Sequence, residues 1–184
     1  MQALALMFDK SIYKSLLTTL LGALIIAVFA QISIEMEPVP ITLQTVAVML
    51  IGYKFSSAQA FKSTTLYMLL GLAGLPVFSN FDFGPQIIFG TTGGYILGFI
   101  PAAYFLALAT ERFGDKSWLT MTALGLVATA ITFVFGISWL SFLIGIEDAI
   151  NFGFLPFIVP GIAKVVMLTS LLKMGNVTGK KYFT

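Results

Sequence analysis

The chain contains no cysteine and no histidine. These absences exclude disulfide bonds, thiolate chemistry, imidazole bases and the usual zinc sites. Charged residues make up only 10% of the sequence, whereas a soluble domain has about 25%. No phosphate-binding GxxxxGK[ST] sequence is present either, so this chain is not expected to hydrolyse ATP by itself. We expect no metal, no cofactor, no nucleic-acid partner and no enzymatic activity.

The sequence is instead rich in hydrophobic residues, which make up 58% of it and form long runs. Apolar segments that are long enough, or nearly so, to cross a bilayer of about 30 Å cover residues 12–34, 41–55, 58–75, 87–110, 118–145 and 154–173. The runs are continuous rather than alternating, which favours helices over a membrane barrel. The first run lacks a clear cleavage site and is interpreted as a retained helix. We therefore expect an all-α integral membrane protein with six transmembrane helices in a single domain, residues 1–184.

The charges separate cleanly on this six-helix arrangement. Basic residues of the termini and of two connections would share one side: Lys10, Lys14, Lys54, Lys62, Arg112, Lys116, Lys173, Lys180 and Lys181. Carboxylates occupy the opposite connections: Glu35, Glu37, Asp82, Glu147 and Asp148. Because basic residues favour the cytoplasmic side of a membrane, both termini are predicted to be cytoplasmic, as in a multi-pass protein of a bacterial cytoplasmic membrane.

Lys164 is the one basic residue that this topology cannot place at a cytoplasmic edge. It lies eight residues after Pro156 in the last apolar segment, or about 12 Å along a helix. A lysine at such depth costs about 2.5–3.5 kcal/mol on insertion scales. Pro156, Pro160 and Gly161 are expected to loosen or bend the backbone just before it.

Three interpretations of Lys164 are open. Its ammonium group could pair with a carboxylate of an outer connection, although no Asp or Glu lies in the middle of a segment. Its long stem could also carry the charge to an interface. In the third, the missing anion is supplied by a ligand carboxylate from outside, because ionisable residues inside a membrane usually mark functional sites.

Other stretches suggest polar or close-packed positions. Gly90, Gly94, Gly98 and Ala102 recur every four residues, which is typical of close helix packing, and Gly94 also permits backbone to approach a ligand. Thr42, Gln44 and Thr45 place polar groups at the outer end of the second segment, either for capping and helix contacts or for a ligand. The loop with "PVF" and Asn80 is predicted to be either a lid or an ordered connector.

Ala23 and Ala27 lie four residues apart on one face of the first segment. Small residues at this spacing permit close approach of two helices. The pair therefore indicates either packing within the chain or a docking face for a partner membrane protein.

Together, "VPITLQT" at 39–45, "YMLLGLAGLPVF" at 67–78, "GTTGGYILGF" at 90–99 and the proline- and glycine-containing entry to Lys164 resemble the BioY family. These proteins are the biotin-specific substrate-binding (S) components of energy-coupling-factor vitamin transporters. The resemblance implies a six-helix bundle that captures biotin from outside, and a complex with a transmembrane coupling protein and two ATPases. It also implies that Ala23 and Ala27 meet the coupling protein.

A biotin site needs a cation for the carboxylate, apolar walls, and amide or hydroxyl groups for the ureido ring. The chain offers Lys164 as the cation. The other candidate residues are Gln44, Phe78, Asn80, Thr92, Gly94, Tyr95 and Asn151.

Two positions depart from the family pattern. Thr91 stands where the family usually has proline, which is expected to loosen the start of the fourth segment. Gly161 stands where the family usually has an aspartate, so a carboxylate that would meet the ligand or restrain Lys164 is missing; Asn80, Asp148 or Asn151 are candidates to replace it.

The alternative functions are a carrier for another small carboxylate-bearing vitamin, a membrane enzyme and a structural subunit. A membrane enzyme acting on lipids would need clustered acidic or histidine residues, and the sequence has no DxxD pair.

Overall fold

The computed structural model describes residues 2–113 and 117–175, with side chains from residue 12 onward. Most of these residues are helical. The elements in chain order are α1 (Gln2–Ala30), β1 (Ser33–Ile34), β2 (Ile41–Thr42), α2 (Gln44–Lys54), α3 (Ser57–Leu72), the 3-10 turn η1 (Ser79–Phe81), α4 (Pro85–Ile88), α5 (Gly93–Phe113), α6 (Trp118–Ile144), α7 (Ile146–Gly153) and α8 (Leu155–Met174).

Four of the described helices are long and apolar enough to cross a membrane. These candidate spans are Ile12–Ala30, Gly93–Phe113, Trp118–Ile144 and Leu155–Met174. Helices α2 and α3 take the places of the second and third predicted segments, but they have only 11 and 16 residues. A helix needs about 20 residues to cross a bilayer, so α2 and α3 are too short to count among the candidate spans.

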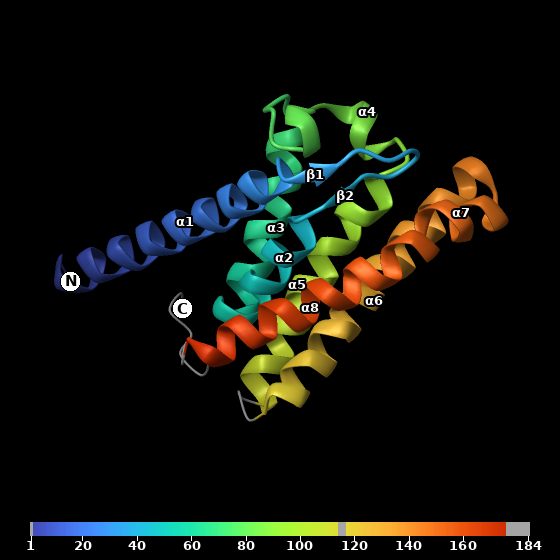
Figure 1. The fold of residues 1–184 in the computed structure, drawn as a ribbon. Helices are drawn as coiled ribbons and strands as arrows, with labels where there is room; N and C mark the ends of the chain where they lie inside the picture. The colour runs from blue at the N-terminus through green and yellow to red at the C-terminus, as the bar shows by residue number, and fades with distance from the viewer. Residues whose placement is uncertain (1, 114–116, 176–184) are drawn as a thin grey trace.

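The helices pack around α5, which contacts α6, α3 and α2. Helix α1 packs on α3, and α8 packs on α6 (Figure 1). The β1–β2 hairpin and α4 gather at one end of the bundle, whereas the last turns of α8 lie toward the other end (Figure 1). The strands pair antiparallel, with Ser33 opposite Thr42.

Two predicted segments have different ends in the structure. The segment 12–34 ends as a helix at Ala30, and its last residues join the hairpin instead. The segment 87–110 is not one helix, because α4 and α5 are separated by a turn. At the start of α5, an added Cβ on Gly93 would lie 1.7 Å from the carbonyl oxygen of Ile88, so the turn is tight enough to require glycine.

The glycine stripe of α5 packs against α6, as the four-residue spacing predicts. An added Cβ on Gly94 would lie 2.3 Å from the Cβ of Trp139 and 2.7 Å from the carbonyl oxygen of Phe135. An added Cβ on Gly98 would lie 3.0 Å from the Cβ of Phe135. Small residues therefore bring two membrane helices close together here.

Local sequence explains where the later helices begin and end. Ser117 caps α6 by accepting a hydrogen bond from the backbone N–H of Thr120 at 3.1 Å, and Gly145 ends it with a φ of 89°. Helix α8 begins at Leu155 with proline in its first turn, where a missing N–H costs nothing. It then continues without a break through Pro160 and Gly161 to Met174.

Candidate ligand-binding site

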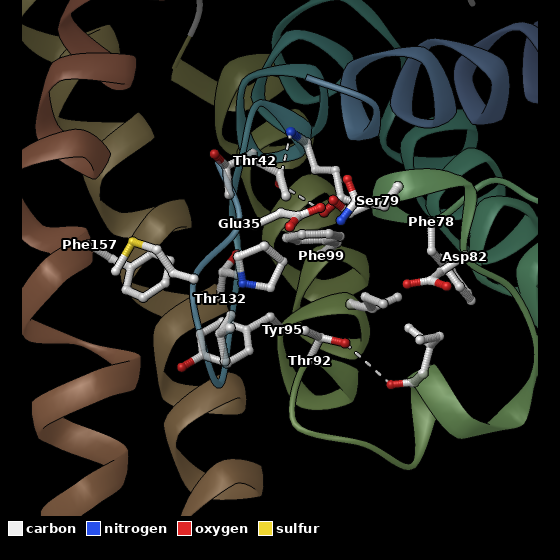
Figure 2. A pocket seen from close by; sticks show the side chains of 18 of the residues that line it. Glu35, Thr42, Phe78, Ser79, Asp82, Thr92, Tyr95, Phe99, Thr132 and Phe157 are labelled. Atoms are coloured by element: carbon white, nitrogen blue, oxygen red, sulfur yellow. Dashed lines mark hydrogen bonds between the residues drawn. The ribbon is translucent and has the colours of Figure 1, made fainter. Parts of the chain in front are cut away.

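A cavity of about 540 Å³ lies beneath the β1–β2 hairpin and the η1 turn, at the end of the bundle that carries α4 (Figure 2). This volume is in the range of small-molecule sites. Its lining residues are Glu35, Met36, Glu37, Val39, Pro40, Thr42, Gln44, Thr45, Phe78, Ser79, Asn80, Asp82, Ile87, Thr92, Tyr95, Ile96, Phe99, Thr129, Thr132, Phe133 and Phe157. They come from β2, α2, α4, α5, α6, α8 and the loops between them, so only the folded chain assembles the site.

Aromatic rings form much of the cavity wall. The rings of Tyr95 and Phe157 are stacked at 28°, with centroids 6.4 Å apart, and Phe133 meets each of them edge to face. Three helices each contribute one ring, because Tyr95 belongs to α5, Phe133 to α6 and Phe157 to α8. Such a wall suits an apolar ring or alkyl chain.

Phe78 anchors the loop that closes another side of the cavity. Its side chain is only 1% exposed and meets Tyr67 of α3 edge to face, with centroids 5.6 Å apart. An added Cβ on Gly71 would lie 2.1 Å from the Phe78 ring. The "GLAGLPVF" stretch therefore carries both halves of one contact, a glycine notch on α3 and the ring that fills it.

Two residues that line the cavity carry a hydroxyl group without a hydrogen-bond partner among the described residues. The unpaired atoms are the buried Oγ1 of Thr45 and the buried Oγ of Ser79. Buried polar atoms are almost always paired in folded proteins. A polar ligand group that reached either oxygen would supply the partner that it lacks. The sequence analysis left Thr45 open as either a helix contact or a ligand contact, and it did not consider Ser79.

Asn80 lines the cavity and lies on an exposed turn. Its side-chain oxygen accepts a hydrogen bond from the Ser33 hydroxyl at 3.2 Å. Asn80 and Phe81 both have left-handed backbone conformations, with φ of 58° and 60°. The side-chain N–H groups of Asn80 have no described partner and can donate to a ligand.

Gln44, Thr92 and Tyr95 also line the cavity, but their polar groups already have partners. The Gln44 amide accepts a hydrogen bond from the Thr42 hydroxyl at 2.9 Å and donates to the hydroxyl of Tyr67. The Tyr95 hydroxyl donates to the carbonyl oxygen of Gly153 at 2.8 Å. The Thr92 hydroxyl donates to a backbone oxygen of α4, as Figure 2 shows. Their main contribution to the cavity is therefore shape.

Lys164 lies directly behind one wall of the cavity. Its half-buried side chain donates a hydrogen bond of 2.6 Å to the carbonyl oxygen of Thr42, which itself lines the cavity. No described carboxylate lies within 4.0 Å of its ammonium group, so the internal ion pair is not formed among the residues that the structure describes. An ammonium has three donors, and Thr42 uses one.

Three of the predicted residues are not among those that line the cavity: Lys164, which lies behind the Thr42 wall, Gly94 and Asn151. Gly94 faces α6, as described above, and is absent from the lining. Asn151 is exposed on α7 and is also absent from the lining, so it cannot take the place of the missing aspartate there. Periodicity and residue type alone did not distinguish a packing glycine from a ligand-facing one.

Ala23 was predicted to be on either a packing or a docking face, and the structure supports packing. Ala23 is 1% exposed and belongs to the core, and Ala27 is half-buried against the same core. Ala23 therefore offers no free surface to a partner in this arrangement of α1.

Thr91, the residue that stands in place of the family proline, ties the start of the fourth segment to the loop over the cavity. Its hydroxyl donates a 2.6 Å hydrogen bond to the carbonyl oxygen of Pro38 in the hairpin loop. This contact joins the turn before α5 to the loop over the cavity. The expected loosening relative to proline is not tested by this contact and stays a prediction.

The family model that matches this chain is that of the BioY family, and it covers residues 3–179. The chain belongs to the BioY family. Among curated proteins, this BioY-family chain is 38% identical to the biotin transporter BioY of Thermotoga maritima over 144 residues, which are 78% of this chain and 84% of the relative. It is 33% identical to the biotin transporter BioY2 of Lactococcus lactis over 176 residues, 92% of this chain and 96% of that one.

A solved structure shares the fold of this BioY-family chain. It is described as the S-component for biotin from an ECF-type ABC transporter, and it matches with a TM-score of 0.81. The match covers 96% of this chain and 98% of that one at 21% sequence identity. The bundle of a membrane S-component is therefore the fold of this chain, as the sequence resemblance implied.

Proposed function

We propose that this chain binds biotin at the cavity beneath the hairpin and serves as the substrate-binding S component of an energy-coupling-factor transporter. The observation that carries the proposal is the cavity of about 540 Å³ with unpaired hydroxyls and a nearby unpaired cation, in a chain of the BioY family. Its relatives are named biotin transporters.

The chemistry of the cavity suits the parts of biotin. The apolar ring and alkyl tail fit against Tyr95, Phe133 and Phe157. The ureido group, which has two donors and one acceptor, needs hydroxyl and amide partners such as those of Ser79 and Asn80. Each polar group of such a ligand must find a partner, because an unpaired one inside the cavity costs binding free energy.

The charged groups around the cavity indicate how the proposed ligand is oriented. The outer loops place Glu35, Glu37 and Asp82 on the cavity, and no lysine or arginine is among the described lining residues. A ligand carboxylate is repelled by these acids and attracted by Lys164 behind the Thr42 wall. We therefore expect the carboxylate to point toward Lys164 and the ureido N–H groups to lie nearer the acids.

The membrane arrangement follows from the fold and the charges. We propose six membrane helices, α1, α2, α3, α5, α6 and α8, with both termini in the cytoplasm of a bacterium and the cavity open to the outside. The hairpin and α4 gather at the end that carries the cavity acids, opposite the last turns of α8 with Lys173 (Figure 1). Lys116, Lys180 and Lys181 lie outside the described residues.

The proposed partners are a transmembrane coupling protein and two ATPases, because this chain has no ATP-binding sequence of its own. Ala27 on the half-buried face of α1, rather than the buried Ala23, is the part of the predicted docking pair that a partner can reach. This chain thus binds and carries its ligand without changing it chemically.

Radiolabelled biotin binding to the detergent-purified chain tests the function. We expect saturable binding of one biotin per chain, with competition by unlabelled biotin but not by other carboxylate-bearing vitamins such as lipoate or pantothenate. Competition by lipoate or pantothenate at equal concentration would favour a carrier of another vitamin. Absence of binding by the folded chain would overturn the proposal.

A matched pair of threonines tests the location. Thr45 and Thr65 both have a buried Oγ1 without a described partner, but only Thr45 lines the cavity. Thr45→Val should weaken biotin binding about tenfold, since it removes one hydrogen bond to the ligand at nearly constant shape. Thr65→Val should leave the affinity unchanged. Equal affinities of the two variants would place the site elsewhere.

A further inference from the structure

The η1 turn holds two consecutive bulky or polar residues in a backbone conformation that such residues rarely adopt. Asn80 has a φ of 58° and Phe81 a φ of 60°. Asparagine tolerates this region, but for a residue as large as phenylalanine it is a true outlier. A strained segment of this kind persists only when its surroundings determine its conformation.

Packing of the Phe81 side chain does not hold the turn in this conformation, because that side chain is 65% exposed. Within the turn, the Asp82 carbonyl oxygen accepts from the N–H of Phe78 at 3.0 Å, and the Ser79 carbonyl oxygen accepts from the N–H of Asp82 at 3.1 Å. These bonds close the loop but leave the N–H of Phe81 without a partner inside it.

Gln31, the first residue after α1, supplies the outside contacts. Its Oε1 accepts a hydrogen bond from the backbone N–H of Phe81 at 2.9 Å, and its Nε2 donates to the carbonyl oxygen of Phe78 at 3.0 Å. The same Nε2 donates to the carbonyl oxygen of Ala27 in the last turn of α1, also at 3.0 Å. One side-chain amide thus spans both ends of the strained turn and fixes it to α1.

We propose that Gln31 is a positioning residue for the ligand site: its amide holds the Ser79–Phe81 turn in its strained conformation and so presents Ser79 and Asn80 to the cavity. The identity of the ligand in this proposal rests on the function proposed above. The role of Gln31 in holding the turn does not depend on that function. Gln31 itself is absent from the cavity lining, so it acts through the turn and not by touching the ligand.

The expected consequence is on binding rather than on overall stability. When the turn is already ordered, a ligand does not have to restrict it, and this raises the affinity. Without the amide, Phe81 is expected to leave the left-handed region, and Ser79 and Asn80 lose their fixed positions on the wall.

Gln31→Met tests the proposal, because methionine keeps the length of the side chain and loses both hydrogen-bonding groups. Gln59→Met is the matched control. Like Gln31, Gln59 has a side-chain amide that links two segments, in this case α3 and α1. It accepts a hydrogen bond from Thr19 at 2.8 Å and donates one to Ser15 at 2.7 Å, but Gln59 is absent from the cavity lining. We expect biotin dissociation to be about tenfold faster in Gln31→Met, from the loss of the two hydrogen bonds that hold the turn, and unchanged in Gln59→Met. Unchanged dissociation in Gln31→Met would overturn the proposal.

A spin label separates this inference from the proposed function. The chain has no cysteine, so Phe83→Cys gives a single labelling site beside the turn, and Phe61→Cys on α3 gives a control site of equal exposure, 48%. Without any ligand, Gln31→Met should increase the mobility of the label at 83 and not at 61. If the wild-type chain binds no biotin, the proposed function fails. If the mobility of the label at 83 is unchanged in Gln31→Met, the Gln31 amide does not hold the turn.

Discussion

The ammonium group of Lys164 in α8 lies 2.6 Å from the carbonyl oxygen of Thr42, at a separation of 122 residues along the chain. This contact joins the last helix to the second strand of the hairpin that covers the cavity. It also keeps a positive charge just behind the Thr42 backbone, next to the cavity. Among the described residues that line this cavity, the charged ones are all carboxylates. The cation is therefore placed to meet a ligand anion while it is partly satisfied by backbone.

Removing this cation should affect the ligand only through the ligand's own charge. We expect Lys164→Met to weaken biotin binding by about 30-fold or more, equivalent to about 2 kcal/mol, because a partly buried charge pair is lost. Binding of the neutral biotin amide should change little. The measurement is calorimetric titration of both ligands against both proteins.

Lys62→Met is the control, since the Lys62 ammonium is exposed and, among the described residues, donates a hydrogen bond only to the Ser15 hydroxyl, at 3.4 Å. Equal losses for biotin and its amide in Lys164→Met would mean that the lysine shapes the hairpin and does not pair with the carboxylate.

Two glycines that look alike in the sequence should respond differently to alanine. At Gly94 an added Cβ would lie 2.7 Å from the Phe135 backbone, so Gly94→Ala must separate α5 from α6, at a cost of about 1–3 kcal/mol. At Gly161 the nearest atom is 3.7 Å away, and Gly161→Ala should be neutral or slightly stabilising in its helix. Thermal unfolding of both variants in the same detergent checks this. A Gly94 variant as stable as the wild type would contradict the close packing.

Thr91→Val should loosen the loop over the cavity. The substitution keeps the shape and removes the 2.6 Å hydrogen bond to the Pro38 carbonyl oxygen, which costs about 1 kcal/mol. We expect faster amide hydrogen exchange in residues 33–42, together with a small loss of thermal stability. In the control Thr110→Val only a bond to Leu106 in the same helix is lost, and the exchange of the hairpin should stay unchanged. Hairpin exchange that is equal in the two variants would argue against the tie.

The Tyr95 hydroxyl should matter for stability and not for the ligand. Tyr95→Phe removes its 2.8 Å hydrogen bond to the Gly153 carbonyl oxygen and leaves that buried acceptor unpaired, so we expect about 1–3 kcal/mol of destabilisation. Biotin affinity should stay within about twofold, because the ring that faces the cavity is retained. A large loss of affinity without a loss of stability would mean that the hydroxyl contacts the ligand. Tyr104→Phe, at an exposed ring, is the control for both measurements.

Much of the helical fold was predictable because a membrane-spanning run leaves few alternatives. The runs at 118–145 and 154–173 correspond to α6 and α8 within one or two residues. Prediction was wrong at 87–110, which is interrupted by a turn. Glycines at 90 and 93 fit both a packed helix and a tight turn, and only the position of the neighbouring Ile88 carbonyl decides between them.

The candidate site was predictable in part. Phe78, Asn80 and Tyr95 were chosen by residue type and lie on the cavity, whereas Asn151 was chosen by the same reasoning and lies on an exposed helix. Ser79 was not considered and Thr45 was left open between a helix contact and a ligand contact, because an unpaired hydroxyl is a property of its surroundings and leaves no mark in the residue itself.

The amino-acid sequence alone determined that this chain lies in a membrane, where its charges accumulate, and that one lysine is out of place, because the transfer of side chains between water and lipid depends on residue type and run length. The tertiary structure decided which glycines pack, which polar groups already have partners, and that Gln31, Thr91 and Lys164 are hydrogen-bonded to the loops around the cavity. These are hydrogen bonds and close contacts between segments far apart in the chain, and only the folded geometry selects one set of them.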